Sequence, residues 1–337
     1  MRGVAVTPKR SIGSSNGQRI VHVRIGNWPS GLYFARLAAS DGRAGFAPFV
    51  VRPRQLGEHR VALIMPTLTW QAYNLRDDDG DGKGDSWYAR WTHKTARVGR
   101  PFLNRGVPYN FRRYDLPLLR WLAQTGREVD VLSQSDLEAV GNVRALAKAY
   151  ELLVFPGHHE YVTRREYDVV ERYRDLGGNL IFLSANNFFW RVVRRGQVIE
   201  KTELWRKLGR PEASLIGVQY RANARFRAAW LVRETPAAAW VFEGTGLHTG
   251  STFGFGGIEI DETATASPRG VQVLAEIPDV FGPGLTAQMT YYETRAGAKV
   301  FAAGAFFFHR LLETDPQTAR IVENLWARLA PLSARSS

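Results

Sequence analysis

Histidine, glutamate and asparagine side chains gather in two short segments, each of which follows an apolar run. The segment GHHEY holds His158, His159 and Glu160 directly after ELLVF, and SANNFFW holds Asn186 and Asn187 after NLIFL. Two imidazoles and a carboxylate on one tight turn suit metal binding or acid–base chemistry. The spacing is not H-E-x-x-H, which excludes an ordinary zinc protease. Asparagine amides orient a carbonyl or a water, but they are also common in plain turns.

A third segment, RDDDGDGKGDSWY, has the spacing of a calcium loop. Asp77, Asp79 and Asp81 stand at alternate positions before a glycine, as in D-x-D-x-D-G. The twelfth position is Tyr88, where an EF-hand has a bidentate glutamate, and Asp85 is the nearest substitute. Bound Ca²⁺ and a solvated acidic turn both stay open for this loop.

The elements around these segments predict an α/β protein. Strand-like runs at 61–65, 128–133, 151–157 and 179–186 are separated by helical patterns at 116–126, 135–149 and 163–178. Such alternation, with continuously apolar strands, predicts a doubly wound, mostly parallel sheet. Ligands bind at the carboxyl ends of its strands, which is where PTLTWQAYN, GHHEY and SANNFFW lie.

The two ends of the chain have different patterns. Val21, Val23 and Ile25 alternate with polar residues, and two further strand-like runs follow, so we expect residues 1–55 to form a small β-sandwich-like segment. Residues 56–332 then form the α/β domain that holds these segments, with a β-rich part at 213–303 and a helix at 315–330 that Asp315 caps. Residues 333–337 are expected to form a frayed tail.

Composition excludes several classes of protein. The chain has 337 residues and no cysteine, so it has no disulfide framework, no thiolate metal site and no thiol nucleophile. Its net charge of +13 comes from dispersed arginines with no nucleic-acid motif, so we expect no nucleic-acid partner; an arginine-rich proteome or an acidic partner accounts for the charge. No apolar run is long enough for a membrane span, and no signal peptide is evident, which predicts a cytoplasmic protein without a membrane partner.

Several of these segments together resemble a known family. GLYFARL with Tyr33, WQAYN with Tyr73, SWYA, GHHEY and SANNFFWRV are similar in order and spacing to the catalytic region of the N,N-dimethylformamidase large (beta) subunit family. The resemblance covers about 300 residues, from Tyr33 to the end of the chain. It implies a class I glutamine-amidotransferase-like fold, in which His-His-Glu stands where amidotransferases carry their nucleophilic cysteine. By themselves, Tyr33 and Tyr73 are ordinary core or surface aromatics.

The resemblance also implies a site and a reaction. It assigns a mononuclear Fe³⁺ to Tyr33, Tyr73 and Glu160, and supporting catalytic roles to His158, Asn186 and the late glutamate Glu293, the last as general base. The reaction expected is hydrolysis of the C–N bond of a small N-substituted amide, such as N,N-dimethylformamide, to an amine and a carboxylate. A small partner subunit and a homo-oligomer are also within the family's pattern, whereas the family's lectin-like β domain is not present in this sequence.

Two other functions are compatible with the sequence. A non-catalytic member of the same fold would bind a carbohydrate or another ligand, for which the ten tryptophans offer stacking surfaces. A hydrolase with another metal, zinc or calcium, would use His158, His159 and the acidic loop.

Overall fold

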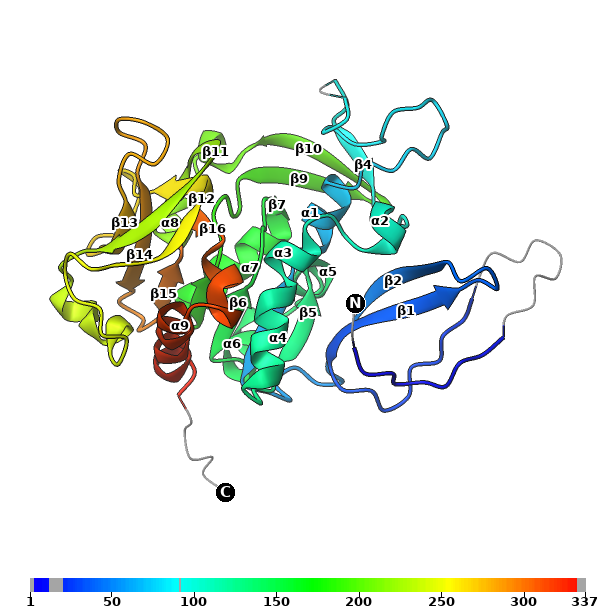
Figure 1. Ribbon diagram of the computed structural model, residues 1–337, viewed down its shortest axis with the longest axis horizontal. Helices are drawn as coiled ribbons and strands as arrows, with labels where there is room; N and C mark the ends of the chain where they lie inside the picture. The colour runs from blue at the N-terminus through cyan, green and yellow to red at the C-terminus, as the bar shows by residue number, and fades with distance from the viewer. Residues whose placement is uncertain (1–2, 12–20, 91, 332–337) are drawn as a thin grey trace.

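The computed structural model describes residues 3–11, 21–90 and 92–331, so the tail expected at 333–337 lies outside the described residues. Its strands form a ten-stranded, a four-stranded and a two-stranded sheet (Figure 1). The strands are β1 (Gly31–Ala38), β2 (Ala44–Val51), β3 (Val61–Met65), β4 (Thr95–Arg97), β5 (Asp130–Ser133), β6 (Leu152–Phe155), β7 (Tyr161–Thr163), β8 (Asn179–Phe182), β9 (Trp190–Arg195), β10 (Val198–Leu204), β11 (Gln219–Val232), β12 (Thr252–Glu262), β13 (Gln272–Ile277), β14 (Ala287–Glu293), β15 (Lys299–Ala302) and β16 (Ala305–Phe306). The helices are α1 (Thr67–Ala72), α2 (Leu103–Gly106), α3 (Phe111–Tyr114), α4 (Leu116–Gln124), α5 (Gln134–Glu138), α6 (Val143–Ala149), α7 (Arg164–Asp175), η2 (Trp205–Leu208), α8 (Ala213–Ile216), η3 (Pro236–Phe242), η4 (Phe308–Glu313) and α9 (Pro316–Leu329).

The large sheet is half parallel and half antiparallel. Its strand order is β16-β12-β11-β13-β14-β15-β8-β6-β3-β5. The strands from β15 to β5 run parallel, and every pairing from β15–β14 to β12–β16 is antiparallel. The sheet is therefore mixed, which corrects the expectation of a mostly parallel sheet. The class I glutamine-amidotransferase-like architecture stays a prediction.

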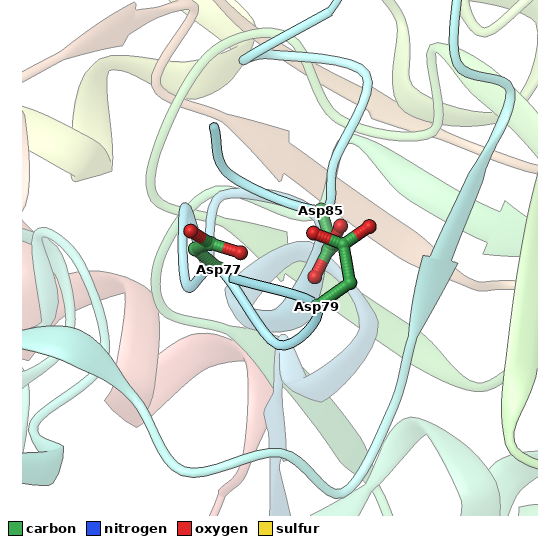
Figure 2. A group of neighbouring side chains, drawn as sticks. All are labelled: Asp77, Asp79 and Asp85. Carbon is green, nitrogen blue, oxygen red and sulfur yellow. The ribbon is translucent and has the colours of Figure 1, made fainter. Parts of the chain in front are cut away.

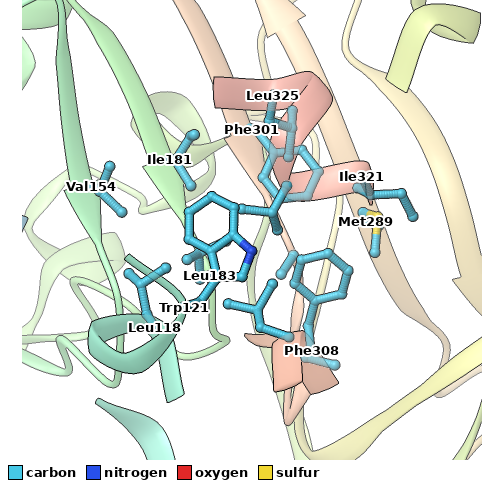
Figure 3. Packing of buried hydrophobic residues seen from close by; sticks show 14 of the residues in the cluster. Leu118, Trp121, Val154, Ile181, Leu183, Met289, Phe301, Phe308, Ile321 and Leu325 are labelled. Atoms are coloured by element: carbon cyan, nitrogen blue, oxygen red, sulfur yellow. The ribbon is translucent and has the colours of Figure 1, made fainter. Parts of the chain in front are cut away.

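Helices cover both faces of the parallel half. Alternate residues of a strand point to opposite faces, and in these strands both sets are apolar, so each face packs against helices. Leu63 and Met65 of β3 belong to the apolar cluster that contains α4 and α9. Ala62 and Ile64 of the same strand belong to the cluster that contains α5, α6 and α7. Figure 3 shows the first cluster, where Trp121 of α4 and side chains of α9 meet β15. Each fully buried Leu, Ile or Phe in these clusters contributes on the order of 2 kcal/mol.

The helix predicted at 135–149 is two helices, α5 and α6. Gly141 and Asn142 interrupt it, and the Asn142 side chain caps α6 by accepting from the backbone N–H groups of Arg144 and Ala145. The cap predicted at Asp315 is confirmed, since its carboxylate accepts from the Gln317 N–H at 3.1 Å.

The four-stranded sheet, in the order β4-β10-β9-β7, lies over the carboxyl edge of the parallel strands (Figure 1). Its apolar side chains pack with Leu68 and Ala72 of α1 and with Trp87. This second sheet holds α1 and the loop after it against the strand ends, where the site is expected.

The N-terminal part differs from the small sandwich expected at residues 1–55. Within the described residues it forms the two-stranded antiparallel sheet of β1 and β2, which lies beside β5 (Figure 1). Val21, Val23 and Ile25 are in no strand and are about half exposed. Alternation alone does not make a strand where no partner strand is available to accept its backbone hydrogen bonds.

Candidate active site

Three connections leave the carboxyl edge of the parallel strands and meet. These are α1 after β3, the turn 156–160 after β6, and residues 183–189 after β8. The last two are joined by backbone hydrogen bonds: Phe188 N–H donates to the His159 carbonyl at 2.7 Å, and Trp190 N–H donates to the Glu160 carbonyl at 2.9 Å. The segments PTLTWQAYN, GHHEY and SANNFFW therefore lie together at the carboxyl edge of the parallel strands.

Two tyrosines converge on one carboxylate oxygen at this edge. Tyr73 ends α1, and Tyr88 ends the acidic loop that follows it. The hydroxyls of both donate to Glu160 Oε2, each at 2.8 Å. Their rings stack with centroids 4.1 Å apart. Glu160 is 4% exposed, so its carboxylate is shielded from bulk water, whereas Tyr88 is 41% exposed.

Further aromatic groups support the cluster from the second sheet. The Tyr88 and Tyr161 hydroxyls are 2.5 Å apart, and Trp87 Nε1 donates to the Tyr161 hydroxyl at 3.0 Å. The Lys201 ammonium lies 4.5 Å from the ring centroid of Trp190, and its charge lowers the pKa of Glu160. The tyrosines are thus held by packing on several sides.

A second carboxylate, Glu259, lies beside the cluster. Asn186 Nδ2 donates to Glu259 Oε2 at 2.8 Å, and the Asn186 backbone N–H donates to Asp261 Oδ1 at 2.8 Å. His158 Nε2 is 3.5 Å from Glu160 Oε2 and 3.8 Å from Glu259 Oε2. His158 therefore stands between the two carboxylates, and Asn186 orients the second one.

An irregularity in β12 accompanies the position of Glu259. The register of β12 with β16 shifts between Gly257 and Ile260, and Ile258 has a φ of 68°. Such bulges break the regular alternation and redirect a side chain, often next to active sites. The side chains of Ile258 and Glu259 both line the pocket described below.

Burial dominates the electrostatics of the group. Burial raises the pKa of Glu160 to about 7, although the hydrogen bonds from the tyrosines lower it. Burial, together with the nearby charge of Glu160, raises the pKa of Glu259 to about 8. Burial, then His159, lowers the pKa of His158 to about 3, so His158 is neutral and its contact with Glu160 is not an ion pair. Burial and Glu160 also raise the pKa values of Tyr73 and Tyr88 well above 10.

The donor set fits a hard trivalent or divalent cation. Phenolate and carboxylate oxygens are hard ligands, and each of the two hydroxyls lies 2.8 Å from Glu160 Oε2, about the separation of neighbouring ligands around an ion with bonds of roughly 2 Å. A cation would favour the ionised phenols and carboxylate, which burial alone disfavours. Tyr73, Tyr88 and Glu160 are therefore the residues suited to hold a metal ion here.

A pocket of about 250 Å³ opens onto this group. Tyr73, His158 and Glu259 line it, and its walls include Trp70, Tyr109, Tyr114 and Phe306. The Tyr109 ring stacks on Tyr73 with centroids 6.1 Å apart. The pocket thus combines aromatic walls with polar and charged groups, which include Asn110, Arg113 and Asp115 besides His158 and Glu259.

Two predicted site residues lie elsewhere. Tyr33, in β1, donates to the Pro29 carbonyl at 2.8 Å and packs on Trp28 and Phe49, and none of its described contacts is with Tyr73 or Glu160. Tyr88 is the second tyrosine of the cluster instead. The cause is the second sheet, which folds the SWYA segment back over the strand ends while β1 packs beside β5.

Glu293 lies at the opposite edge of the sheet. It pairs with Lys299 at the start of β15, which runs parallel to β8 and is level with its first residues, whereas Asn186 follows the end of β8. Its carboxylate accepts from the Tyr291 hydroxyl at 2.5 Å. The structure thus places Glu293 away from the cluster, whereas Glu259 lies beside His158 and Asn186.

Three carboxylates of the acidic loop do gather, as Figure 2 shows for Asp77, Asp79 and Asp85. Their oxygens lie within 4.8 Å of one another, whereas Asp81 pairs with Arg90. Asp77 also accepts from the backbone N–H groups of Gly80 and Gly82, which lowers its pKa and closes the loop without an ion. Calcium binding by this loop stays a prediction.

Sequence analysis alone did not assign roles to Tyr88 and Glu259. Tyr88 lies in SWYA, a segment of the family resemblance, and it was considered only as a position of the calcium loop. Glu259 lies in β12, and the residues next to it in the sequence form no motif that indicates a binding or catalytic role.

The fold and the site define an α/β protein with a buried phenol–carboxylate cluster at the carboxyl edge of its parallel strands. The family model described as N,N-dimethylformamidase beta subunit-like, C-terminal, matches residues 18–320. The chain belongs to this family.

Two curated relatives and one solved structure are similar to parts of the chain. It is 29% identical over 186 residues to the N,N-dimethylformamidase beta subunit of an Alcaligenes species and 28% identical over 186 residues to that of Paracoccus aminophilus. Each match covers 54% of this chain and 24% of the relative, so the match spans about a quarter of the relatives' length. The mmIFT52 N-terminal domain superposes with a TM-score of 0.41 at 12% identity, over 67% of this chain and 93% of that one. Among the described residues, no helix is long and apolar enough to cross a membrane.

Proposed function

We propose that this chain hydrolyses the C–N bond of a small N-substituted amide, with a ferric ion held by Tyr73, Tyr88 and Glu160. The observation that carries the proposal is the convergence of both hydroxyls on Glu160 Oε2 at 2.8 Å, beside a pocket that Tyr73 lines. Membership of the dimethylformamidase family supports the reaction class, because the relatives it matches carry that enzyme's name.

Ferric iron is the ion that best suits the donor set. Two phenolates and one carboxylate supply three negative charges from hard oxygen donors, which balances Fe³⁺. When bound, such an ion supplies Lewis-acid polarisation of the amide carbonyl and lowers the pKa of water in the pocket. Tyrosinate ligation would also colour the protein.

Glu259 is the group we propose as general base. Its carboxylate lines the pocket, and the Asn186 amide fixes one of its oxygens. Glu259 accepts a proton from the attacking water and then delivers it to the leaving nitrogen, so that the tetrahedral intermediate collapses to an amine and a carboxylate. A cation beside Glu160 opposes the charge that raises the pKa of Glu259, which favours its basic form.

His158 acts as a neutral group in this scheme. Burial keeps it uncharged, so its Nε2 is able to bond the substrate or the intermediate without adding charge to the site. Asn186 holds Glu259 with its Nδ2, while its buried Oδ1 has no hydrogen-bond partner among the described residues and is left to accept from a water or an amide N–H.

The pocket suits small amides with apolar substituents. At roughly 30 Å³ per water-sized group, 250 Å³ holds about eight such groups, and N,N-dimethylformamide has five non-hydrogen atoms. Trp70, Tyr114 and Phe306 offer apolar contact to the N-substituents. Dimethylformamide itself gives dimethylamine and formate.

Metal analysis with a visible spectrum of the purified protein is the experiment that tests this function. We expect about one iron per chain, a broad tyrosinate absorption, and release of dimethylamine from N,N-dimethylformamide. Iron without hydrolysis of any small amide would favour a ligand-binding member of the family. A colourless protein that hydrolyses amides with zinc or calcium would replace the ferric ion.

A partner subunit is part of the proposal. The relatives are named as beta subunits, and a subunit of opposite charge would suit a chain of net charge +13. Size-exclusion chromatography of the chain alone and of its complex from the native source distinguishes a self-sufficient enzyme, a homo-oligomer and a hetero-oligomer.

A further inference from the structure

We propose that Gln134 is a positioning residue that sets the separation of Tyr73 and Glu160; this inference rests on the proposed function. Gln134 opens α5 and is completely buried, and its hydrogen bonds within the described residues go to Leu68, Tyr161 and Glu166 rather than to those two side chains. It instead joins the backbones of the two segments that carry them. No comparison or motif assigns a role to this residue.

The amide of Gln134 spans three elements. Its Oε1 accepts from the Leu68 N–H of α1 at 2.7 Å. Its Nε2 donates to the Tyr161 carbonyl of β7 at 2.9 Å and to Glu166 Oε2 of α7 at 2.9 Å. One side chain therefore fixes the start of α1 against the residue that follows Glu160.

Helix α1 depends on an acceptor from outside. It has six residues, its N-cap is Pro66, and no side chain of its own caps it. The first N–H groups of a helix have no partner within the helix, and a helix this short is unstable by itself. Gln134 supplies the missing acceptor at Leu68, so the direction of α1, and with it the place of Tyr73 at its other end, is set from α5.

A second hydrogen bond joins α1 to β7 directly. The Tyr161 N–H donates to Thr69 Oγ1 at 3.3 Å, so both backbone polar groups of Tyr161 are engaged by side chains from α1 or α5. A metal site requires its ligands within about 0.5 Å of their places. Loss of the Gln134 bridge should therefore affect the site more than the rest of the fold.

Glu166 completes the bridge as an acceptor. Both of its carboxyl oxygens accept from Gln134 Nε2, at 3.2 and 2.9 Å, and its backbone N–H donates to Thr163 Oγ1 at 3.2 Å. Because Glu166 takes the amide N–H, the Gln134 amide stays oriented with Oε1 toward Leu68. Burial raises the pKa of Glu166 well above its ordinary value.

Gln134→Met removes the hydrogen bonds to all three partners, Leu68, Tyr161 and Glu166, and keeps a side chain of similar length. Asn179→Leu is its matched control. Asn179 is also a bridging amide, but at the opposite edge of the sheet: its Nδ2 donates to the Leu329 carbonyl at 2.8 Å, and its Oδ1 accepts from Lys299 N–H at 2.8 Å. We expect both variants to lose stability in urea. Only Gln134→Met should bind Fe³⁺ roughly tenfold more weakly and shift the tyrosinate absorption.

The double variant Gln134→Glu with Glu166→Gln separates the two halves of the bridge. It keeps an acceptor for the Leu68 N–H and an amide N–H donor between the two positions, but it removes the amide donor to the Tyr161 carbonyl, so its ferric affinity should stay as low as that of Gln134→Met. Wild-type ferric affinity in this double variant would overturn the inference. Wild-type affinity and absorption in Gln134→Met, or equal losses in Asn179→Leu, would overturn the inference.

Failure of the proposed function is separable from failure of this inference. If the wild-type chain shows no tyrosinate absorption with Fe³⁺, the ferric proposal fails. The ¹³C chemical shifts of the Tyr73 ring in the metal-free protein then still decide the role of Gln134. They should change in Gln134→Met and stay constant in Asn179→Leu; unchanged shifts in both would overturn it.

Discussion

Tyr73 and Tyr88 stack with ring centroids 4.1 Å apart and aim both hydroxyls at Glu160 Oε2. The acidic loop that joins them is anchored at its base by Arg100, whose guanidinium is nearly buried and donates to the Asn74 carbonyl at 2.9 Å and to Asp78 Oδ2 at 3.3 Å. The loop therefore returns Tyr88 to the end of the helix that Tyr73 terminates.

Tyr88→Phe should abolish or greatly weaken iron binding and remove the visible absorption, because one of three anionic donors is lost. Tyr33→Phe is the control, since Tyr33 contacts Pro29, Trp28 and Phe49 instead. Iron content per chain and the visible spectrum check both variants. The reverse pattern, loss in Tyr33→Phe alone, would restore Tyr33 as the ligand and reject the cluster described above.

Glu259→Gln should lower kcat by roughly 10²–10⁴-fold while iron stays bound, because the variant loses the proton acceptor and keeps the shape. Glu293→Gln, at the far edge of the sheet, should leave kcat unchanged. Steady-state hydrolysis of dimethylformamide with iron analysis measures both. A larger effect from Glu293 than from Glu259 would reverse their assigned roles.

Asp115 makes stability depend on pH. Burial raises the pKa of this carboxyl to about 8, although Trp70 Nε1 donates to it at 3.1 Å. Between about pH 4 and pH 8 the unfolded chain has lost this proton and the folded chain has kept it, so the free energy of unfolding falls as pH rises, by at most about 1.4 kcal/mol per pH unit. Below this window the effect vanishes, and above it the loss is constant.

Asp115→Asn removes the ionisable carboxyl, so the free energy of unfolding of this variant should depend less on pH between 5 and 8 than that of the wild type. Urea denaturation across that range measures the difference. Asp41→Asn, on an exposed ion pair with Arg43, is the matched control and should keep the wild-type slope. Equal slopes in all three proteins would show that Asp115 ionises normally.

The calcium hypothesis predicts that Ca²⁺ raises the thermal midpoint of the protein and that a chelator reverses the rise. Asp79→Asn should remove the effect because Asp79 belongs to the clustered carboxylates, whereas Asp81→Asn should preserve it. Calorimetric titration checks the affinity directly. No heat of binding and no shift at millimolar Ca²⁺ would leave the loop as a solvated acidic turn.

The sequence by itself determined the parallel half of the sheet and the edge on which the site lies. Buried strands such as LLVF and NLIF have short continuous apolar runs, and the helices between them have apolar residues at helical spacing. Both kinds of element are therefore predictable from neighbouring residues in the sequence. Since parallel strands end at one edge, His158, Glu160 and Asn186 were placed together without any knowledge of contacts.

Tertiary structure decided which tyrosine and which second glutamate join them. Tyr88 reaches Glu160 across 72 positions because a second sheet covers the loop, and Glu259 reaches Asn186 across 73 positions through a register shift in β12. Such pairings depend on packing between distant strands, for which local period and composition carry no information. The same reason explains why Tyr33 and Glu293, which the family resemblance assigned to the site, lie away from it.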